Sequence, residues 1–156
     1  MDVAFINPFV ESVYDFFSTM LDSEVQRKSL SLREGYRAAP NDVVASIDLD
    51  GWIRGTVEIS FPRGTAIAVF NRLTGMDSRE VDDSVLDSVG ESVNIIAGSA
   101  KAKLGQADAP PLDLGIPRVF CGHQDGIDSQ TMRWIEISFA SGLGPLALRV
   151  AFQADS

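Results

Sequence analysis

A carboxylate and an amide stand three residues apart, as Glu91 and Asn94, in a stretch whose apolar spacing predicts a helix over residues 82–104. Gly90 and Gly98 lie one helical turn before and one turn after Asn94. This spacing places bare backbone above and below the Asn94 amide. An interior glycine costs roughly 1 kcal/mol against alanine, so this pattern indicates a polar pair presented to a partner that approaches very closely. The alternative is an ordinary solvated helix face whose glycines serve local packing.

The remaining residues of this stretch indicate how the polar pair is oriented. Acidic residues lie near its start, at Asp82, Asp83 and Asp87, where negative charge suits the helix dipole. Apolar residues recur at helical spacing on the side opposite Glu91 and Asn94, so that side is expected to be buried. The apolar stripe consists of Val85, Val89, Val93, Ile96, Ala100 and Leu104.

Other residues with catalytic potential are few. His123, the one histidine, follows Cys121, the one cysteine, by two residues, and the two offer too few ligands for zinc at this spacing. We interpret them as a loop histidine and a partly buried cysteine. The sequence has no nucleophile elbow, P-loop or dinucleotide fingerprint. An enzyme built on this chain therefore lacks its own nucleophile, base and metal, which leaves reactions in which the substrate carries most of the chemistry.

Composition limits the class of protein and its partners. A chain of 156 residues, 45% apolar and 22% charged, is typical of one soluble domain with a single core. The formal charge of −9 argues against nucleic acid or an anionic membrane as the main partner. No apolar run approaches the roughly 20 residues of a membrane span, and the N-terminus does not resemble a secretory signal. A single cysteine excludes an internal disulfide and fits a reducing cytoplasm.

Alternation of apolar and polar residues predicts an antiparallel sheet built from two hairpins. The first hairpin is expected to turn at Asp50 and Gly51, and the second at the sequence SGLGP. Each hairpin has one apolar and one mostly polar face, which predicts a sheet covered on one side. The four hairpin strands are expected over residues 43–49, 53–61, 135–139 and 146–152.

Helices are expected to supply that cover. Helical spacing predicts a helix from Asn7 to about Leu21 and another over residues 63–73 that stops at Gly75. Weaker patterns indicate strands over residues 29–34 and 116–120 and a loop over residues 105–114. The fold class is therefore α+β, an antiparallel sheet built from hairpins with helices packed on one face.

The long helix resembles that of the CheX members of the CheC/CheX/FliY phosphatases of bacterial chemotaxis and two-component signalling. The shared pattern is an aspartate, then G-E-x-x-N, then A-G, which appears here as Asp87, residues 90–94 and Ala97-Gly98. The stretches INPFVESVYDFF, GTVEISFPRGTAIAVFNRLTG and LGIPRVFCG extend the similarity over essentially the whole chain. The resemblance implies a CheC/CheX-like fold and a single CheX-like phosphatase domain over residues 1–156.

Members of this family hydrolyse the aspartyl phosphate of a response regulator such as CheY. The regulator supplies the phosphorylated aspartate, a bound Mg²⁺ and a conserved lysine. The resemblance implies that Glu91 pairs with that lysine and that Asn94 orients a water in line with the phosphorus atom. It implies further that Asp87, Gly90 and Gly98 adjoin the docked regulator. This chain itself is expected to bind no metal or cofactor and to act in the cytoplasm.

Two departures from the family pattern limit what is carried over. Val93 stands before the asparagine where a small residue is common, but it falls on the apolar stripe. Two-site members carry a second E-x-x-N on the first helix, whereas Tyr14 follows Glu11 here at that spacing, which implies one active site per chain. The family also implies a homodimer joined through sheet edges, for which the alternating C-terminal strands are candidates.

Two other functions compete with a phosphatase. A non-catalytic CheX-fold interaction module would bind a signalling partner without accelerating hydrolysis, and loss of Glu91 or Asn94 would have favoured it. A small-molecule binding domain is the third possibility, which a ligand-induced melting shift without any regulator would support.

Overall fold

The computed structural model describes residues 5–34, 41–52, 54–105, 112–121 and 132–153. Its helices are α1 (Asn7–Asp15), which continues as the π-helical turn η2 (Phe16–Met20), α2 (Arg63–Thr74) and α3 (Asp83–Gly105). No helix in these ranges is long and apolar enough to cross a membrane. The strands are β1 (Val25–Glu34), β2 (Val43–Gly51), β3 (Gly55–Phe61), β4 (Leu112–Leu114), β5 (Arg118–Cys121), β6 (Met132–Ser141) and β7 (Leu146–Gln153).

The strands form one antiparallel sheet in the order β1-β6-β7-β3-β2-β4, with β5 also paired to β2. The predicted C-terminal hairpin is confirmed as β6 and β7, but both strands lie inside the sheet, with a paired neighbour on each side. The expectation that these strands provide a sheet edge is therefore wrong. Strand β1 forms one outer edge, and the short strands β4 and β5 border the other.

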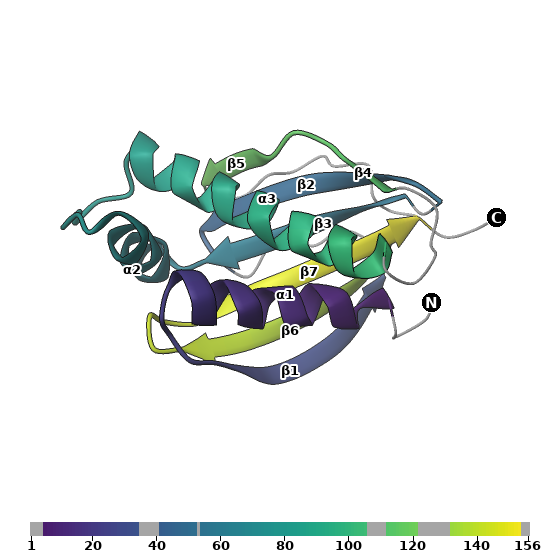
Figure 1. Ribbon diagram of the computed structural model, residues 1–156, viewed down its shortest axis with the longest axis horizontal. Coiled ribbons are helices and arrows are strands. Elements are labelled where there is room, and N and C mark those ends of the chain that lie inside the picture. Colours follow the sequence, from purple (N-terminus) through teal and green to yellow (C-terminus); the bar gives the residue numbers. More distant parts are fainter. Residues whose placement is uncertain (1–4, 35–40, 53, 106–111, 122–131, 154–156) are drawn as a thin grey trace.

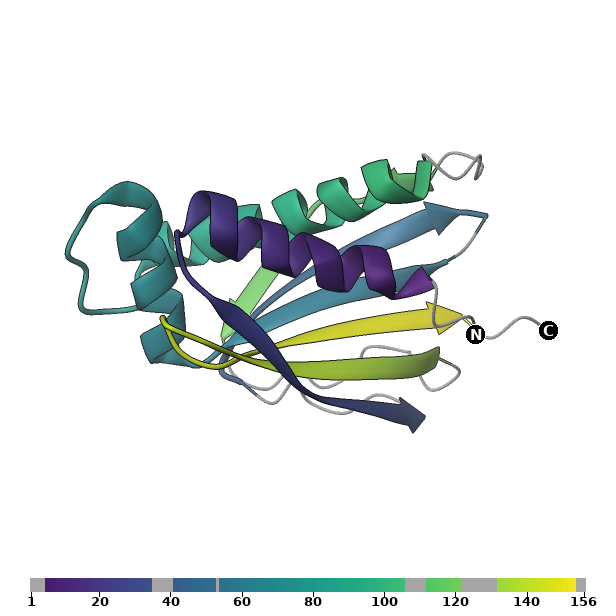
Figure 2. The same ribbon diagram turned by 60° about the horizontal axis from the view of Figure 1, so that its bottom comes forward.

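The helices cover one face of this sheet, as predicted. Helices α1 and α3 lie side by side across it, and α2 packs at one end, near the start of α3 (Figures 1 and 2). Alternate strand residues such as Ile59, Ile137 and Leu148 are fully buried beneath the helices. Together with apolar residues of the helices, including Phe9, Val13, Val69, Val89, Val93 and Ile96, they form one contiguous core.

The predicted helix over residues 63–73 is confirmed as α2, which ends where Gly75 takes up a left-handed conformation with φ 73°. The first hairpin is confirmed as a strand pair, but its predicted two-residue turn is wrong. Register pairs Leu49 with Gly55, so the connection is longer than two residues. Asp50 and Gly51 remain in β2 because β4 pairs with this end of the strand.

The face of the sheet opposite the helices is buried at its centre. Glu58 on β3 and Arg149 on β7 are each 1% exposed, and Arg149 Nη1 lies 3.5 Å from Glu58 Oε1. The Arg149 guanidinium also lies 3.6 Å from Glu136 and 4.6 Å from the centre of the Trp134 ring. Burial raises the pKa of the Glu58 carboxyl, while Arg149 opposes that shift. The expectation of a sheet covered on one side only is wrong here.

Candidate functional site on helix α3

Helix α3 begins with a side-chain cap and buries the predicted stripe. The carboxylate of Asp82 accepts a hydrogen bond of 3.0 Å from the backbone N–H of Val85, and Asp83 lies in the first turn. Every stripe residue from Val85 to Ala100 is buried and Leu104 is partly buried. Val93 is fully buried, so its departure from the family pattern lies in the core and not on the exposed face.

Glu91 and Asn94 lie on the outer side of α3, as predicted. Glu91 is exposed and Asn94 is partly buried, one turn further along the helix. Within the described residues neither side chain makes a hydrogen bond or an ion pair. The Asn94 amide therefore keeps both its donors and its acceptor for a water or a partner, and the Glu91 carboxylate is open to a cation.

Gly90 has a different environment from the one expected. It is buried, and a Cβ atom built on it would lie 2.8 Å from Cγ2 of Val119 on β5. Carbon atoms pack at about 3.5–4.0 Å, so no side chain fits here without movement of the helix, the strand or the Val119 side chain. The bare backbone at Gly90 is thus covered by β5 and does not face a partner directly, which corrects the sequence-based account of this glycine.

Gly98 and Asp87 lie where the sequence predicts. A Cβ atom at Gly98 would meet nothing within 4 Å, so the backbone one turn after Asn94 is open on its outer side. The Asp87 side chain is exposed, as is that of Asp83. With Glu91 they give the first half of the outer face of α3 a negative charge, which suits a cationic group on a partner.

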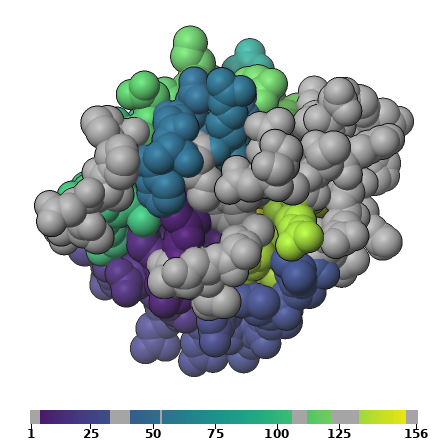
Figure 3. Space-filling model, turned by 90° about the vertical axis from the view of Figure 1, so that its right-hand side faces the viewer, coloured from purple at the N-terminus to yellow at the C-terminus, as the bar shows by residue number. Residues whose placement is uncertain are grey.

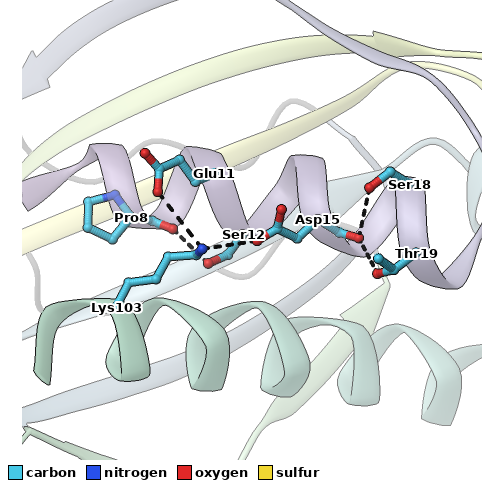
Figure 4. Close-up of polar contacts among 7 residues, drawn as sticks. All are labelled: Pro8, Glu11, Ser12, Asp15, Ser18, Thr19 and Lys103. Atoms are coloured by element: carbon cyan, nitrogen blue, oxygen red, sulfur yellow. Dashed lines mark hydrogen bonds and ion pairs between the residues drawn. The ribbon is translucent and has the colours of Figure 1, made fainter. Parts of the chain in front are cut away.

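Lys103, near the end of α3, joins this helix to α1. Its Nζ lies 3.0 Å from Asp15 Oδ2 and 3.9 Å from Glu11 Oε2, and Figure 4 shows it reaching across from α3 between the two carboxylates. Lys103 is only 30% exposed, so solvent screens this contact less than a pair at the open surface. The contact helps fix α3 against α1 along the length that carries Asn94.

The position that corresponds to a second site on α1 is occupied by internal contacts. Glu11 faces Lys103, and the Tyr14 hydroxyl accepts a hydrogen bond of 3.3 Å from the backbone N–H of Arg27. The Tyr14 ring also packs edge-on against Phe139, with 6.1 Å between ring centres. Glu11 and Tyr14 thus make contacts within the chain and, unlike Glu91 and Asn94, are not open to a partner.

The described residues contain no group of histidine, cysteine and carboxylate side chains that could hold a metal ion. Cys121 is exposed, which corrects the expectation of a partly buried thiol. His123 lies outside the described residues.

Sequence reasoning missed Val119 and Lys103. Val119 stands within a predicted strand and has no distinctive spacing, although the cost of a glycine inside a helix is a signal that something packs against it. Lys103 carries no signal of its own, because its partners are about ninety residues away on α1.

Comparison with solved structures shows which class of proteins shares this fold. The chain has a TM-score of 0.87 and 28% identity to a CheC-like superfamily protein from Shewanella sp. PV-4, over 99% of this chain and all of that one. It has a TM-score of 0.82 and 21% identity to CheX in the CheX–CheY–BeF3–Mg²⁺ complex from Borrelia burgdorferi, over 96% of this chain and 98% of that one. The fold is that of the CheC-like class.

Sequence comparison shows to which family within this class the chain belongs. The model of the family described as chemotaxis phosphatase CheX matches residues 43–139, which include all of α3. The CheY-P phosphatase CheX of Thermotoga maritima is 28% identical over 130 residues, 83% of each chain. The chain belongs to the CheX family of chemotaxis phosphatases.

Proposed function

We propose that this chain hydrolyses the aspartyl phosphate of a CheY-like response regulator. The observation that carries the proposal is the pair Glu91 and Asn94 on the outer face of α3, neither of them engaged by any described residue. Membership of the CheX family supports the reaction, as do the relative named CheY-P phosphatase and the relative solved with CheY.

In this proposal Asn94 orients the water that attacks the phosphorus atom. The amide oxygen accepts a hydrogen bond from the water, which directs an oxygen lone pair at phosphorus, in line with the bond to the regulator's aspartate. The new P–O bond forms as the bond to the aspartyl oxygen breaks, which releases the free carboxylate and inorganic phosphate that carries the protons of the water. An amide does not titrate near neutral pH, so Asn94 positions the water and removes no proton from it.

Glu91 has a docking role. Its exposed carboxylate lies one turn before Asn94, where it pairs with the lysine that the family's regulators carry beside the phosphorylated aspartate. Because both residues lie on one rigid helix, this ion pair sets the depth and register at which the amide enters the regulator's site. Asp87 adds negative charge next to Glu91, and the open backbone at Gly98 leaves room beside the amide.

The metal ion of this reaction belongs to the regulator. This chain binds no cofactor in the proposal, and the regulator's Mg²⁺ neutralises charge on the phosphoryl oxygens. The acidic outer face of α3 is complementary to that ion and to the regulator's lysine. Such a regulator belongs to two-component signalling and acts in the cytoplasm, where we therefore locate the chain.

We also propose that two copies pair through β1. The outer side of this strand has no partner among the described strands, and Leu30 and Leu32 on it are 49% and 63% exposed. Register places both leucines on the helix side of the sheet, opposite Ile137 and Ile135 of β6. Figure 3 shows the violet-blue side chains of β1 along the lower margin of the molecule, beside the purple side chains of α1. A second β1 in antiparallel register would continue the sheet and cover the leucines.

Loss of label from a phosphorylated CheY-like regulator in the presence of Mg²⁺ tests the proposed reaction. We expect catalytic amounts of the chain to accelerate loss over the regulator's own rate. If no receiver domain of the source organism is dephosphorylated faster, the chain is a non-catalytic interaction module, and Glu91 and Asn94 serve docking alone.

A further inference from the structure

The close contact between α3 and β5 places a second element beside the turn of α3 that precedes Asn94. Val119 of β5 packs against the bare backbone of Gly90, one turn before Asn94, at a distance that leaves no room for a Cβ atom. Figure 1 shows α3 running from left to right and β5 from right to left, with the two elements adjacent. Residues that precede Val119 therefore follow the helix in the direction of Asn94.

Distances along the two elements match. Asn94 lies about 6 Å beyond Gly90 along the helix axis, at 1.5 Å per residue. Two residues back from Val119 correspond to about 6.6 Å along a strand. The connection between β4 and β5, residues 115–117, thus extends from the Gly90–Val119 contact in the same direction as the stretch of α3 that carries Asn94 and Gly98.

One side chain in this connection is unusually exposed. Ile116 is 87% exposed, the largest value among the large apolar side chains of the described residues. Leu112, four residues earlier, is 3% exposed, and Val119 is partly buried, so the segment packs at both ends and presents Ile116 between them. The exposed Ile116 side chain, together with the open amide and the acidic face of α3, offers a partner both an apolar and a charged contact.

We propose that the phosphorylated receiver domain docks across both elements, with the acidic face of α3 on its lysine and Mg²⁺ and Ile116 in apolar contact with its surface. This inference rests on the proposed function, and charge complementarity selects the partner. Glu91 and Asn94 are carried by the same helix, so α3 alone does not fix its own tilt relative to the regulator. A contact on the β4–β5 connection supplies that second point, and the Gly90–Val119 contact holds the two points at a fixed separation.

Substitution of Ile116 tests the docking surface. Ile116→Ser removes an exposed apolar side chain, so it is expected to raise KM for the phosphorylated regulator roughly tenfold, as interface anchors do. Met20→Ser is the matched control, because Met20 is 45% exposed at the end of η2, and its KM is expected to stay at the wild-type value. An unchanged KM for Ile116→Ser overturns the inference.

Substitution of Gly90 tests the fixed separation. Gly90→Ala forces α3 and β5 apart by about 1 Å, which at a catalytic centre is enough to lower kcat on the order of a hundredfold. Val119→Ala added to it removes the obstructing methyl group and is expected to restore kcat. Gly64→Ala on α2, where a Cβ atom meets nothing within 4 Å, controls for the chemical change and is expected to leave kcat unaltered. Failure of the double variant to recover activity, with thermal unfolding at the wild-type temperature, overturns the positioning role.

These outcomes separate the inference from the proposed function. A wild-type chain without phosphatase activity contradicts the function itself. A fully active wild-type chain whose Ile116→Ser variant keeps the wild-type KM contradicts the docking surface alone.

Discussion

Arg149 and Glu58 form an ion pair 3.5 Å apart on neighbouring strands, with each side chain 1% exposed. Within the part of the chain that the structure describes, only one oxygen of Glu58 takes part, since Oε2 is buried and has no hydrogen-bond partner there. A carboxylate held in this way is poorly compensated for its lost hydration, which is why burial raises its pKa despite the neighbouring guanidinium.

The raised pKa of Glu58 predicts how pH affects stability. In the folded chain this carboxyl keeps its proton to higher pH than in the unfolded chain. The contribution of the protonated carboxyl to folding stability is therefore fully present below about pH 4.5, and it is lost as pH rises through the folded-state pKa. Glu58→Gln removes this titration. Urea unfolding of both proteins from pH 4 to pH 8 is expected to show wild type losing stability relative to the variant as pH rises. The exposed Glu24→Gln serves as control, and a difference between wild type and Glu58→Gln that is flat or grows with pH contradicts the assignment.

The two glycines that flank Asn94 predict opposite effects of one substitution. Gly90→Ala forces a methyl group against Val119 and is expected to lower the free energy of unfolding by about 1–3 kcal/mol. Gly98→Ala places its methyl group in open space and is expected to raise the free energy of unfolding by up to about 1 kcal/mol, because alanine favours the helix. Urea unfolding measures both. Equal effects in the two variants would show that the contact with β5 does not constrain position 90.

The free edge of β1 predicts the oligomeric state. Sedimentation equilibrium is expected to give about twice the chain mass of 16.9 kDa for wild type. Leu30→Lys combined with Leu32→Lys puts charge on the paired edge and is expected to give the monomer mass. Met20→Lys, at an exposed apolar side chain that ends η2 and is not part of β1, is expected to remain dimeric. A measured mass of 16.9 kDa for the wild-type protein would rule out the dimer.

Much of α3 was predictable from sequence, whereas its surroundings were not. Its apolar stripe, its acidic start and the exposure of Glu91 and Asn94 all follow from residues within one helix. The turn at Asp50 was predicted wrongly because β4, some sixty residues further on, extends β2 past it. Similarly, Val119 and Gly90 meet only through the fold, and Arg149 lies 91 residues from Glu58. Local periodicity carries no information about such partners.

The docking role of Glu91 predicts a change in affinity. Glu91→Lys places like charge against the regulator's lysine and is expected to raise KM by more than tenfold. Thermal unfolding should be nearly unchanged, since the side chain is exposed. Glu24→Lys makes the same change of charge at an exposed position before β1 and controls for the effect of net charge. If both variants raise KM equally, long-range charge accounts for the effect and Glu91 is not a specific contact.

The role of Asn94 is the central claim, and its removal tests it most directly. Loss of label from a phosphorylated CheY-like regulator at saturating concentration, with Mg²⁺, gives kcat for wild type and Asn94→Ala, with Asn7→Ala at an exposed position on α1 as control. Asn94→Ala is expected to lower kcat roughly a hundredfold while regulator binding and thermal unfolding stay close to wild type, and Asn7→Ala is expected to be fully active. Retention of more than about half of the wild-type kcat by Asn94→Ala would contradict the water-positioning role.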